Sequence, residues 1–196
     1  MALSLVTPPE IEPVPYQELQ SHLRVTTDRE KGLIVDLGVA AREYVEHQTH
    51  RALNTQTWDW SLDRFPCGDV FALPKAPLIS VTSITYYDTA LVLQTWSSSY
   101  YTVNAPAGPH CSPGTIALVS GQVYPATRSA PDSVIVRFIA GYGKGESDVP
   151  FMLRNAIKLM VGHWFNAGRE LVAPDRTLAQ VPVTIDAMIW PFKAFS

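Results

Sequence analysis

The feature that most constrains the fold is a change of hydrophobic period in the first third of the chain. Between residues 27 and 50 apolar residues recur every three or four positions, as they do on one face of a helix. From Thr55 to Pro66 they recur at every second position, as they do on one face of a strand. A helix that leads directly into a strand places both kinds of structure in one fold. The pattern therefore predicts an α+β protein.

The helix is expected to begin at a capping box. The Thr27 hydroxyl would accept a hydrogen bond from an early backbone N–H, and Glu30 would reach back to the cap. One side of this helix is predicted to face the core and the other to face solvent. The core side carries Leu33, Leu37, Ala40, Ala41 and Tyr44, and the solvent side carries Arg29, Asp36, Glu43, His47 and His50.

The rest of the chain divides into a helical part and a β-rich part of a single domain. Residues 1–14 are rich in Pro and predict a flexible arm. The helical part, 15–54 and 146–196, contains two N-terminal helices, a long C-terminal helix that starts near Pro150, and a short terminal helix. Together they predict a helical bundle with a β-rich insertion over 55–140. The predicted strands are 56–64, 70–73, 81–87, 91–96, 100–103, 115–119 and 133–139.

Within the β-rich part, no Asp, Glu, Lys or Arg occurs between Asp88 and Arg128. Charged residues are depleted in the cores of protein interfaces, so this stretch could be a surface that a partner covers. A well-buried sheet with polar turns would explain the same composition. The sequence leaves both interpretations open.

Net charge and cysteine content exclude several classes of protein. The formal charge is -3 and the basic residues are scattered, which argues against a dedicated nucleic-acid-binding surface. Cys67 and Cys111 are too few for a disulfide framework, although a single bridge remains open. We expect neither a signal peptide nor a membrane span, because no apolar run is long enough.

Candidate chemical groups have simpler explanations. His47, His50 and Glu43 share a helical face, but their spacing lacks the usual zinc pattern, so we predict no metal site. Asp59 and Asp63 fall on the polar side of a strand, and the adjacency of His110 and Cys111 in sequence is no evidence of a spatial pair. No Gly-x-Ser-x-Gly motif is present. We therefore predict no catalytic residue and no cofactor.

The best candidate for an enzyme site is the glycine turn, Gly141-Tyr142-Gly143-Lys144-Gly145. It lies between a strand and a helix, where a phosphate cradle would occur, but its spacing fits neither nucleotide-binding motif. A small nucleotide-binding enzyme that uses this turn is therefore the less favoured alternative.

The order of these features resembles the head–tail connector (adaptor, or head-completion) proteins of tailed bacteriophages, which also occur in prophages and gene transfer agents. The most specific pieces are Thr55-Gln56-Thr57-Trp58 and Leu62-Asp63-Arg64-Phe65-Pro66. Similar pieces follow at Leu73-Pro74-x-Ala76-Pro77-Leu78 and at Phe138-x-Ala140-Gly141-Tyr142-Gly143. The chain departs from the family where Ala167-Gly168 separate Asn166 from Arg169-Glu170, and where Trp190-Pro191-Phe192 replace a Leu-rich end.

The resemblance implies a structural virion protein without enzymatic activity. Such a protein forms a homo-oligomeric ring of about twelve copies beneath the portal. The ring extends the channel used in DNA packaging, and double-stranded DNA passes through it non-specifically. Its partners are the portal protein, a stopper or tail-completion protein and other copies of itself, with no membrane. The location is the head–tail interface of the virion, and the host cytoplasm during assembly. Another completion module, itself a stopper or tail-completion protein, is the alternative.

The C-terminal segment is the predicted portal interface, because we expect its aromatic and aliphatic side chains to be exposed at a chain end that would otherwise be disordered. The residues concerned are Ile185, Met188, Ile189, Trp190, Phe192 and Phe195.

Overall fold

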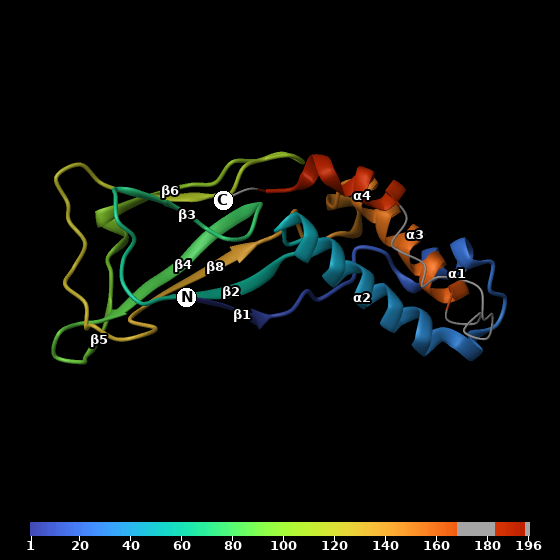
Figure 1. Ribbon diagram of the computed structural model, residues 1–196, viewed down its shortest axis with the longest axis horizontal. Coiled ribbons are helices and arrows are strands. Elements are labelled where there is room, and N and C mark those ends of the chain that lie inside the picture. The colour runs from blue at the N-terminus through green and yellow to red at the C-terminus, as the bar shows by residue number, and fades with distance from the viewer. Residues whose placement is uncertain (168–182, 195–196) are drawn as a thin grey trace.

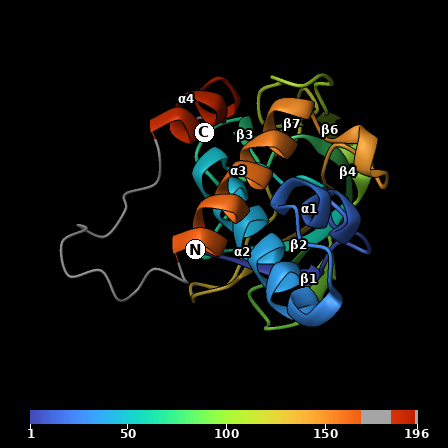
Figure 2. The same ribbon diagram turned by 90° about the vertical axis from the view of Figure 1, so that its right-hand side faces the viewer.

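The computed structural model describes residues 1–167 and 183–194, and it confirms the α+β class. The helices gather at one end of an elongated molecule and the strands extend from them toward the other end (Figure 1). Seen from the helical end, the helices lie together in front of the strands (Figure 2). The helices are α1 (Tyr16–Leu23), α2 (Lys31–Thr49), α3 (Phe151–Ala167) and α4 (Val183–Ile189), and a 3-10 turn, Trp190–Phe192, follows α4.

The strands form two antiparallel sheets. The five-stranded sheet has the order β1-β2-β8-β4-β5, and the three-stranded sheet has the order β3-β7-β6. The strands are β1 (Ala2–Thr7), β2 (Gln56–Leu62), β3 (Val70–Ala72), β4 (Leu78–Tyr87), β5 (Leu93–Thr95), β6 (Tyr101–Asn104), β7 (Thr115–Leu118) and β8 (Val134–Ala140). Each of the seven predicted strands is present, with bounds that differ by up to three residues.

The N-terminus is the main correction to the predicted architecture. Residues 1–14 were expected to form a flexible arm, but Ala2–Thr7 form β1 and pair with β2. Leu3 lies opposite Trp60 and Leu5 lies opposite Trp58 in this ladder. Because β1 precedes the helices, the sheet is not simply an insertion between them. Leu3 and Leu5 alternate with Ala2 and Ser4, but the run is short, and only its pairing with β2, more than fifty residues away, identifies it as a strand.

The start and the buried face of α2 also differ from expectation. The Thr27 side chain makes no capping hydrogen bond, and a 3-10 turn (Asp28–Glu30) precedes the helix. Leu33, predicted to face the core, is 52% exposed, whereas its neighbour Ile34 is fully buried. The buried face is rotated by about one position and includes two charged residues. It consists of Ile34, Gly38, Ala41, Arg42, Val45, Glu46 and Thr49.

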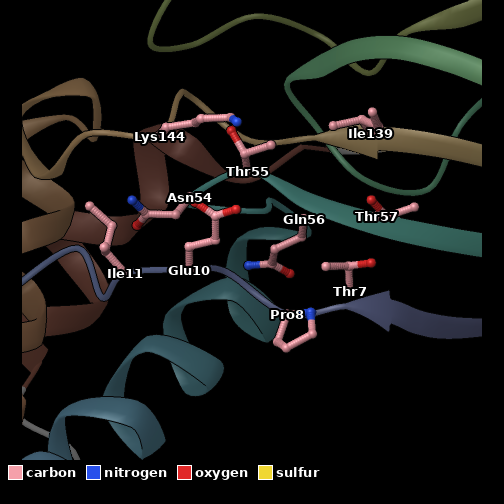
Figure 3. Close-up of a pocket in the computed structure, with 10 residues that line it drawn as sticks. All are labelled: Thr7, Pro8, Glu10, Ile11, Asn54, Thr55, Gln56, Thr57, Ile139 and Lys144. Atoms are coloured by element: carbon pink, nitrogen blue, oxygen red, sulfur yellow. The ribbon is translucent and has the colours of Figure 1, made fainter.

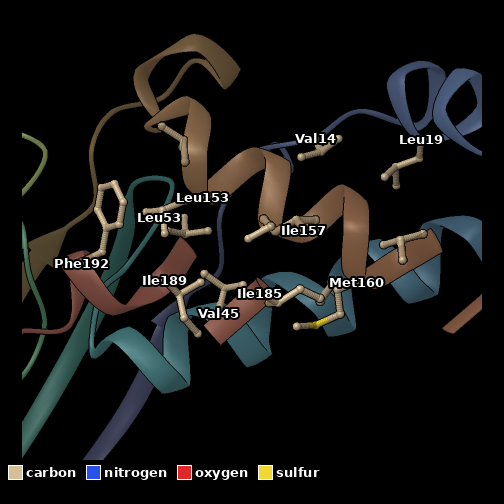
Figure 4. Close-up of a cluster of buried hydrophobic side chains, with 14 of the residues drawn as sticks. Val14, Leu19, Val45, Leu53, Leu153, Ile157, Met160, Ile185, Ile189 and Phe192 are labelled. Carbon is tan, nitrogen blue, oxygen red and sulfur yellow. The ribbon is translucent and has the colours of Figure 1, made fainter. Parts of the chain in front are cut away.

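The molecule has two hydrophobic clusters. The first lies among the helices, where Leu153, Ile157 and Met160 of α3 pack with residues of α1, α2 and α4 (Figure 4). The second lies between the sheets, where Leu62 and Phe138 are fully buried. Trp58 and Trp60 pack against the second cluster, as the alternation in β2 predicted.

Candidate functional site

The junction between the helical end and the sheets contains a buried ion pair. Arg42 and Glu46 lie one turn apart on α2, and the Arg42 Nη1 is 2.9 Å from the Glu46 Oε2. The Arg42 Nε donates to the Glu12 Oε2 at 2.8 Å. Both α2 side chains are more than nine-tenths buried, so the pairing compensates charges that would be costly to bury alone.

Glu46 also binds the segment that leads into β2. Its Oε1 accepts from the Leu53 backbone N–H at 2.8 Å and from the Gln56 Nε2 at 2.6 Å. Burial raises the pKa of the Glu46 carboxyl, although the Arg42 guanidinium acts in the opposite direction. One carboxyl group therefore fixes the end of α2 relative to the first residue of β2.

Arg51, just after α2, joins three segments that are distant in sequence. It is 2% exposed, its Nε donates to the Phe192 carbonyl, and its Nη2 donates to the Cys111 carbonyl at 2.7 Å. The guanidinium also lies 5.9 Å from the centre of the Tyr142 ring. Arg51 thus ties the C-terminal segment and the loop around Cys111 to the end of α2.

The glycine turn already holds a carboxylate of the same chain. The Gly145 N–H donates to the Asp148 Oδ2 at 2.7 Å. A Cβ atom at Gly143 would lie 2.2 Å from the same oxygen, so this space is filled. Asp148 occupies the position in which a phosphate cradle would hold its anion. The turn closes on itself instead.

A pocket of about 230 Å³ lies between the end of β1 and the start of β2 (Figure 3). Asn54 and Gln56 line it and are almost fully buried, and their Oδ1 and Oε1 atoms have no hydrogen-bond partner in the described part of the chain. Gln56 directs its Nε2 to Glu46, which leaves its oxygen as an acceptor. Lys144 and Glu10 line the same pocket, so charges of both signs are present.

The predicted portal-interface residues do not share one environment. Ile185, Ile189 and Phe192 are buried in the helical cluster, so the expectation that they are exposed was wrong (Figure 4). Met188 packs partly against that cluster. Trp190 is 64% exposed, with the Lys193 Nζ 4.9 Å from the centre of its ring. Phe195 lies outside the described residues.

The uncharged stretch that follows Asp88 is partly core and partly surface. Trp96 and Ile116 are buried between the sheets, as the buried-sheet interpretation requires. Leu91, Val92 and Leu93 are exposed, as the interface interpretation requires. Each interpretation therefore accounts for one part of the stretch.

The other candidate groups gave no assembled site. Glu43 and His47 are exposed on α2 and His50 is exposed just after it, and residues 1–167 and 183–194 contain no cluster suited to a metal ion. Cys67 and Cys111 are free thiols. No helix in the same ranges is long and apolar enough to cross a membrane.

The sequence interpretation missed Arg42, Glu46 and Arg51. The one available signal was the spacing of Arg42 and Glu46, which suits an ion pair on a helix. That spacing does not distinguish a buried pair from an exposed one.

Comparison with known proteins gives structural matches only. No protein-family model and no curated protein matches the chain. A chain from a structure described as the neck of an empty gene transfer agent (GTA) particle, computed with C6 symmetry, aligns with a TM-score of 0.81 and 23% identity. A chain from the virion of a native GTA particle aligns with a TM-score of 0.80 and 22% identity. A chain from the neck of a native GTA particle, computed with C12 symmetry, aligns with a TM-score of 0.78 and 21% identity. Each alignment covers 100% of this chain and 97% of the other. The chain therefore has the fold of a protein found in GTA particles, whose neck is a phage-like head–tail connection.

Proposed function

We propose that this protein is a head–tail connector, a structural subunit of the neck of a phage-like particle. The observation that carries the proposal is the fold match over the whole chain to proteins in GTA neck structures. The resemblance noted in the sequence supports the same function independently, because it rests on motifs rather than on shape. The protein would be located in the virion, and in the host cytoplasm while the particle assembles.

We further propose that about twelve copies form a ring beneath the portal and that double-stranded DNA passes through its channel. Support for a ring comes from the cyclic symmetries, C6 and C12, with which the neck structures were computed. A ring subunit must keep one conformation while it contacts DNA and neighbouring proteins. The polar junction serves this need, because Glu46 and Arg51 fix the helical end relative to the sheets.

Trp190 is the residue we propose for contact with the portal. It is the predicted interface residue that is both described and largely exposed, whereas Ile185, Ile189 and Phe192 anchor the segment in the core. Aromatic residues that are exposed at the end of a well-anchored segment are typical of binding hot spots.

The test is electron microscopy of the purified protein mixed with the portal protein of the same particle. We expect rings at the exit of the portal, and a chain that never forms rings in the presence of the portal would refute the function. Trp190→Ser should weaken portal binding in a pull-down. Phe151→Ser is the matched control, since Phe151 is also an exposed aromatic residue, on α3.

Two alternatives give different results in the same experiments. A stopper or tail-completion protein would bind the distal side of a connector ring and would leave a bare portal unoccupied. A nucleotide-binding enzyme would be stabilised against heat by a nucleotide with Mg²⁺. Asp148 in the glycine turn argues against the enzyme, because a bound phosphate would have to displace this carboxylate.

A further inference from the structure

The connection between β4 and β5 is a rigid tip organised by Asp88. The Asp88 Oδ1 accepts from the backbone N–H groups of Ala90 and Val92, at 2.9 and 3.0 Å. Its Oδ2 accepts from the Gln94 Nε2 at 3.0 Å. The Asp88 backbone N–H donates to the Val92 carbonyl at 3.0 Å, which closes the turn. A tip held in this way loses little conformational entropy when it binds.

This tip presents aliphatic side chains to solvent in an unfavourable backbone conformation. Leu91 has φ +64°, in the left-handed region that suits Gly or Asn far better than a bulky side chain. Its side chain is 67% exposed, and the adjacent Val92 and Leu93 are more than half exposed. Hydrogen bonds to Asp88 hold Leu91 in this conformation, including one from the Leu91 N–H to the Asp88 carbonyl at 3.0 Å. Strained backbone that its surroundings hold in place occurs often at functional positions.

At the opposite edge of the same sheet, β1 is a second apolar surface. Every residue of β1 is exposed, although Leu3 and Leu5 lie beside the partly buried Trp60 and Trp58. The strand carries no charged side chain and no Pro, two of the devices that keep an edge strand from pairing with another chain, although its register with β2 shifts between Leu5 and Thr7. Asp59 lies opposite Ser4 in the ladder and is paired with Arg137, and the N-terminal ammonium group lies 3.9 Å from the Asp63 carboxylate.

We propose that the tip formed by Leu91, Val92 and Leu93 of one copy docks on β1 of the next copy around the ring. The two surfaces differ, and they lie at opposite edges of one sheet, β1 and β5 being its first and last strands. A contact between two different surfaces of identical chains is head-to-tail, and repeated rotation closes such contacts into a ring. The three docking residues and β1 carry no charged side chain, and both carboxylate oxygens of Asp88 are already hydrogen-bonded within the turn. The proposal rests on the proposed function, since it assumes a ring.

A disulfide experiment tests the pairing directly. In a background with Cys67→Ser and Cys111→Ser, one protein carries Leu5→Cys and a second carries Leu91→Cys. The two are mixed, assembled with the portal and oxidised. We expect mixed dimers, and no dimers when a protein carrying Leu33→Cys, on the exposed side of α2, replaces the Leu5→Cys protein.

A single substitution tests the energetic contribution of the tip. Leu91→Asn suits the left-handed conformation, so the isolated subunit should unfold at the same temperature as the wild type or at a higher one. Assembly should nevertheless weaken about tenfold or more, because a buried Leu side chain is removed from the contact. Leu33→Asn, which changes an equally apolar exposed residue, should leave assembly unchanged.

The outcomes separate this inference from the proposed function. Rings that form without the mixed disulfide, or that tolerate Leu91→Asn, overturn the docking and leave the connector function in place. Dimers between two Leu91→Cys chains would show a symmetric contact and would also overturn it. A protein that forms no ring even with the portal overturns both proposals.

Discussion

Replacing Arg51 by Met should detach the C-terminal segment from the rest of the fold. Met occupies a similar volume but donates no hydrogen bond, so the carbonyl groups of Phe192 and Cys111 lose their buried donor. Each unsatisfied carbonyl costs about 1–3 kcal/mol. Removing the burial cost of the guanidinium offsets part of this loss, so we expect a net destabilisation of about 2–4 kcal/mol. That is a substantial share of a total stability of about 5–15 kcal/mol.

The assay is unfolding in urea followed by fluorescence of the five tryptophans, with thermal unfolding alongside. For a chain of this length, a loss of 2–4 kcal/mol lowers the melting temperature by about 4–16 °C. Hydrogen exchange should rise in Trp190–Phe192 before it rises in the sheets, because Arg51 holds this segment directly.

Arg137→Met is the matched control, since it makes the same chemical change at an ion pair with Asp59 in which Arg137 is 46% exposed. An exposed pair contributes about 0–1 kcal/mol, so this variant should stay close to the wild type. If Arg51→Met also unfolds within about 1 kcal/mol of the wild type, Arg51 does not hold the segment and our account of the junction is wrong.

Two further predictions follow from the glycine turn and from a buried phenol. Gly141 has φ +139°, and a Cβ there would lie 2.4 Å from the Asn54 carbonyl oxygen, so Gly141→Ala should cost at least about 1–2 kcal/mol in urea unfolding. Gly32→Ala in α2, where a Cβ meets open space, should stabilise the protein by up to about 1 kcal/mol. If the two substitutions change the free energy of unfolding equally, the close contact at Gly141 is not what makes its substitution costly. Burial raises the pKa of Tyr142 to about 12, and its hydroxyl donates to the Pro109 carbonyl at 2.7 Å. A raised pKa contributes stability that is present below pH 10 and is lost as the pH rises toward 12, so Tyr142→Phe should flatten the fall in stability over that range.

Local patterns in the sequence predicted the types of element well. Alternation identified β2 and the side of it that carries Trp58, Trp60 and Leu62. Successive side chains of a strand point to opposite faces of the sheet, whichever strand lies beside it. For the other predicted strands, the turn residues between them indicated where each strand begins and ends. For α2, the three- and four-residue spacing identified a helix but misplaced its buried face by about one position. Leu33 and Ile34 are both aliphatic, and only the packing of the neighbouring helices decides which of them is covered.

The candidate site was less predictable than the fold. The sequence indicated that the C-terminal segment was apolar, and this led to the expectation of an exposed interface. The structure buries Ile185 and Ile189 and leaves Trp190 exposed, because α4 packs one side of its short helix on α2 and α3. The apolar tip at Leu91 belongs to the uncharged stretch that follows Asp88. Composition alone could not separate the exposed part of that stretch from the buried part.

By itself, the sequence determined the α+β class, the seven strands it predicted and the absence of charge between Asp88 and Arg128. Each of these follows from residue types and spacings within a short segment. Only the tertiary structure decided that β1 pairs with β2, that Arg42 and Glu46 are buried together, and that Arg51 reaches Phe192, 141 residues later in the chain. The physical reason is that burial and hydrogen bonding depend on what packs against a residue. For these residues, the partners lie far away in sequence and no local pattern identifies them.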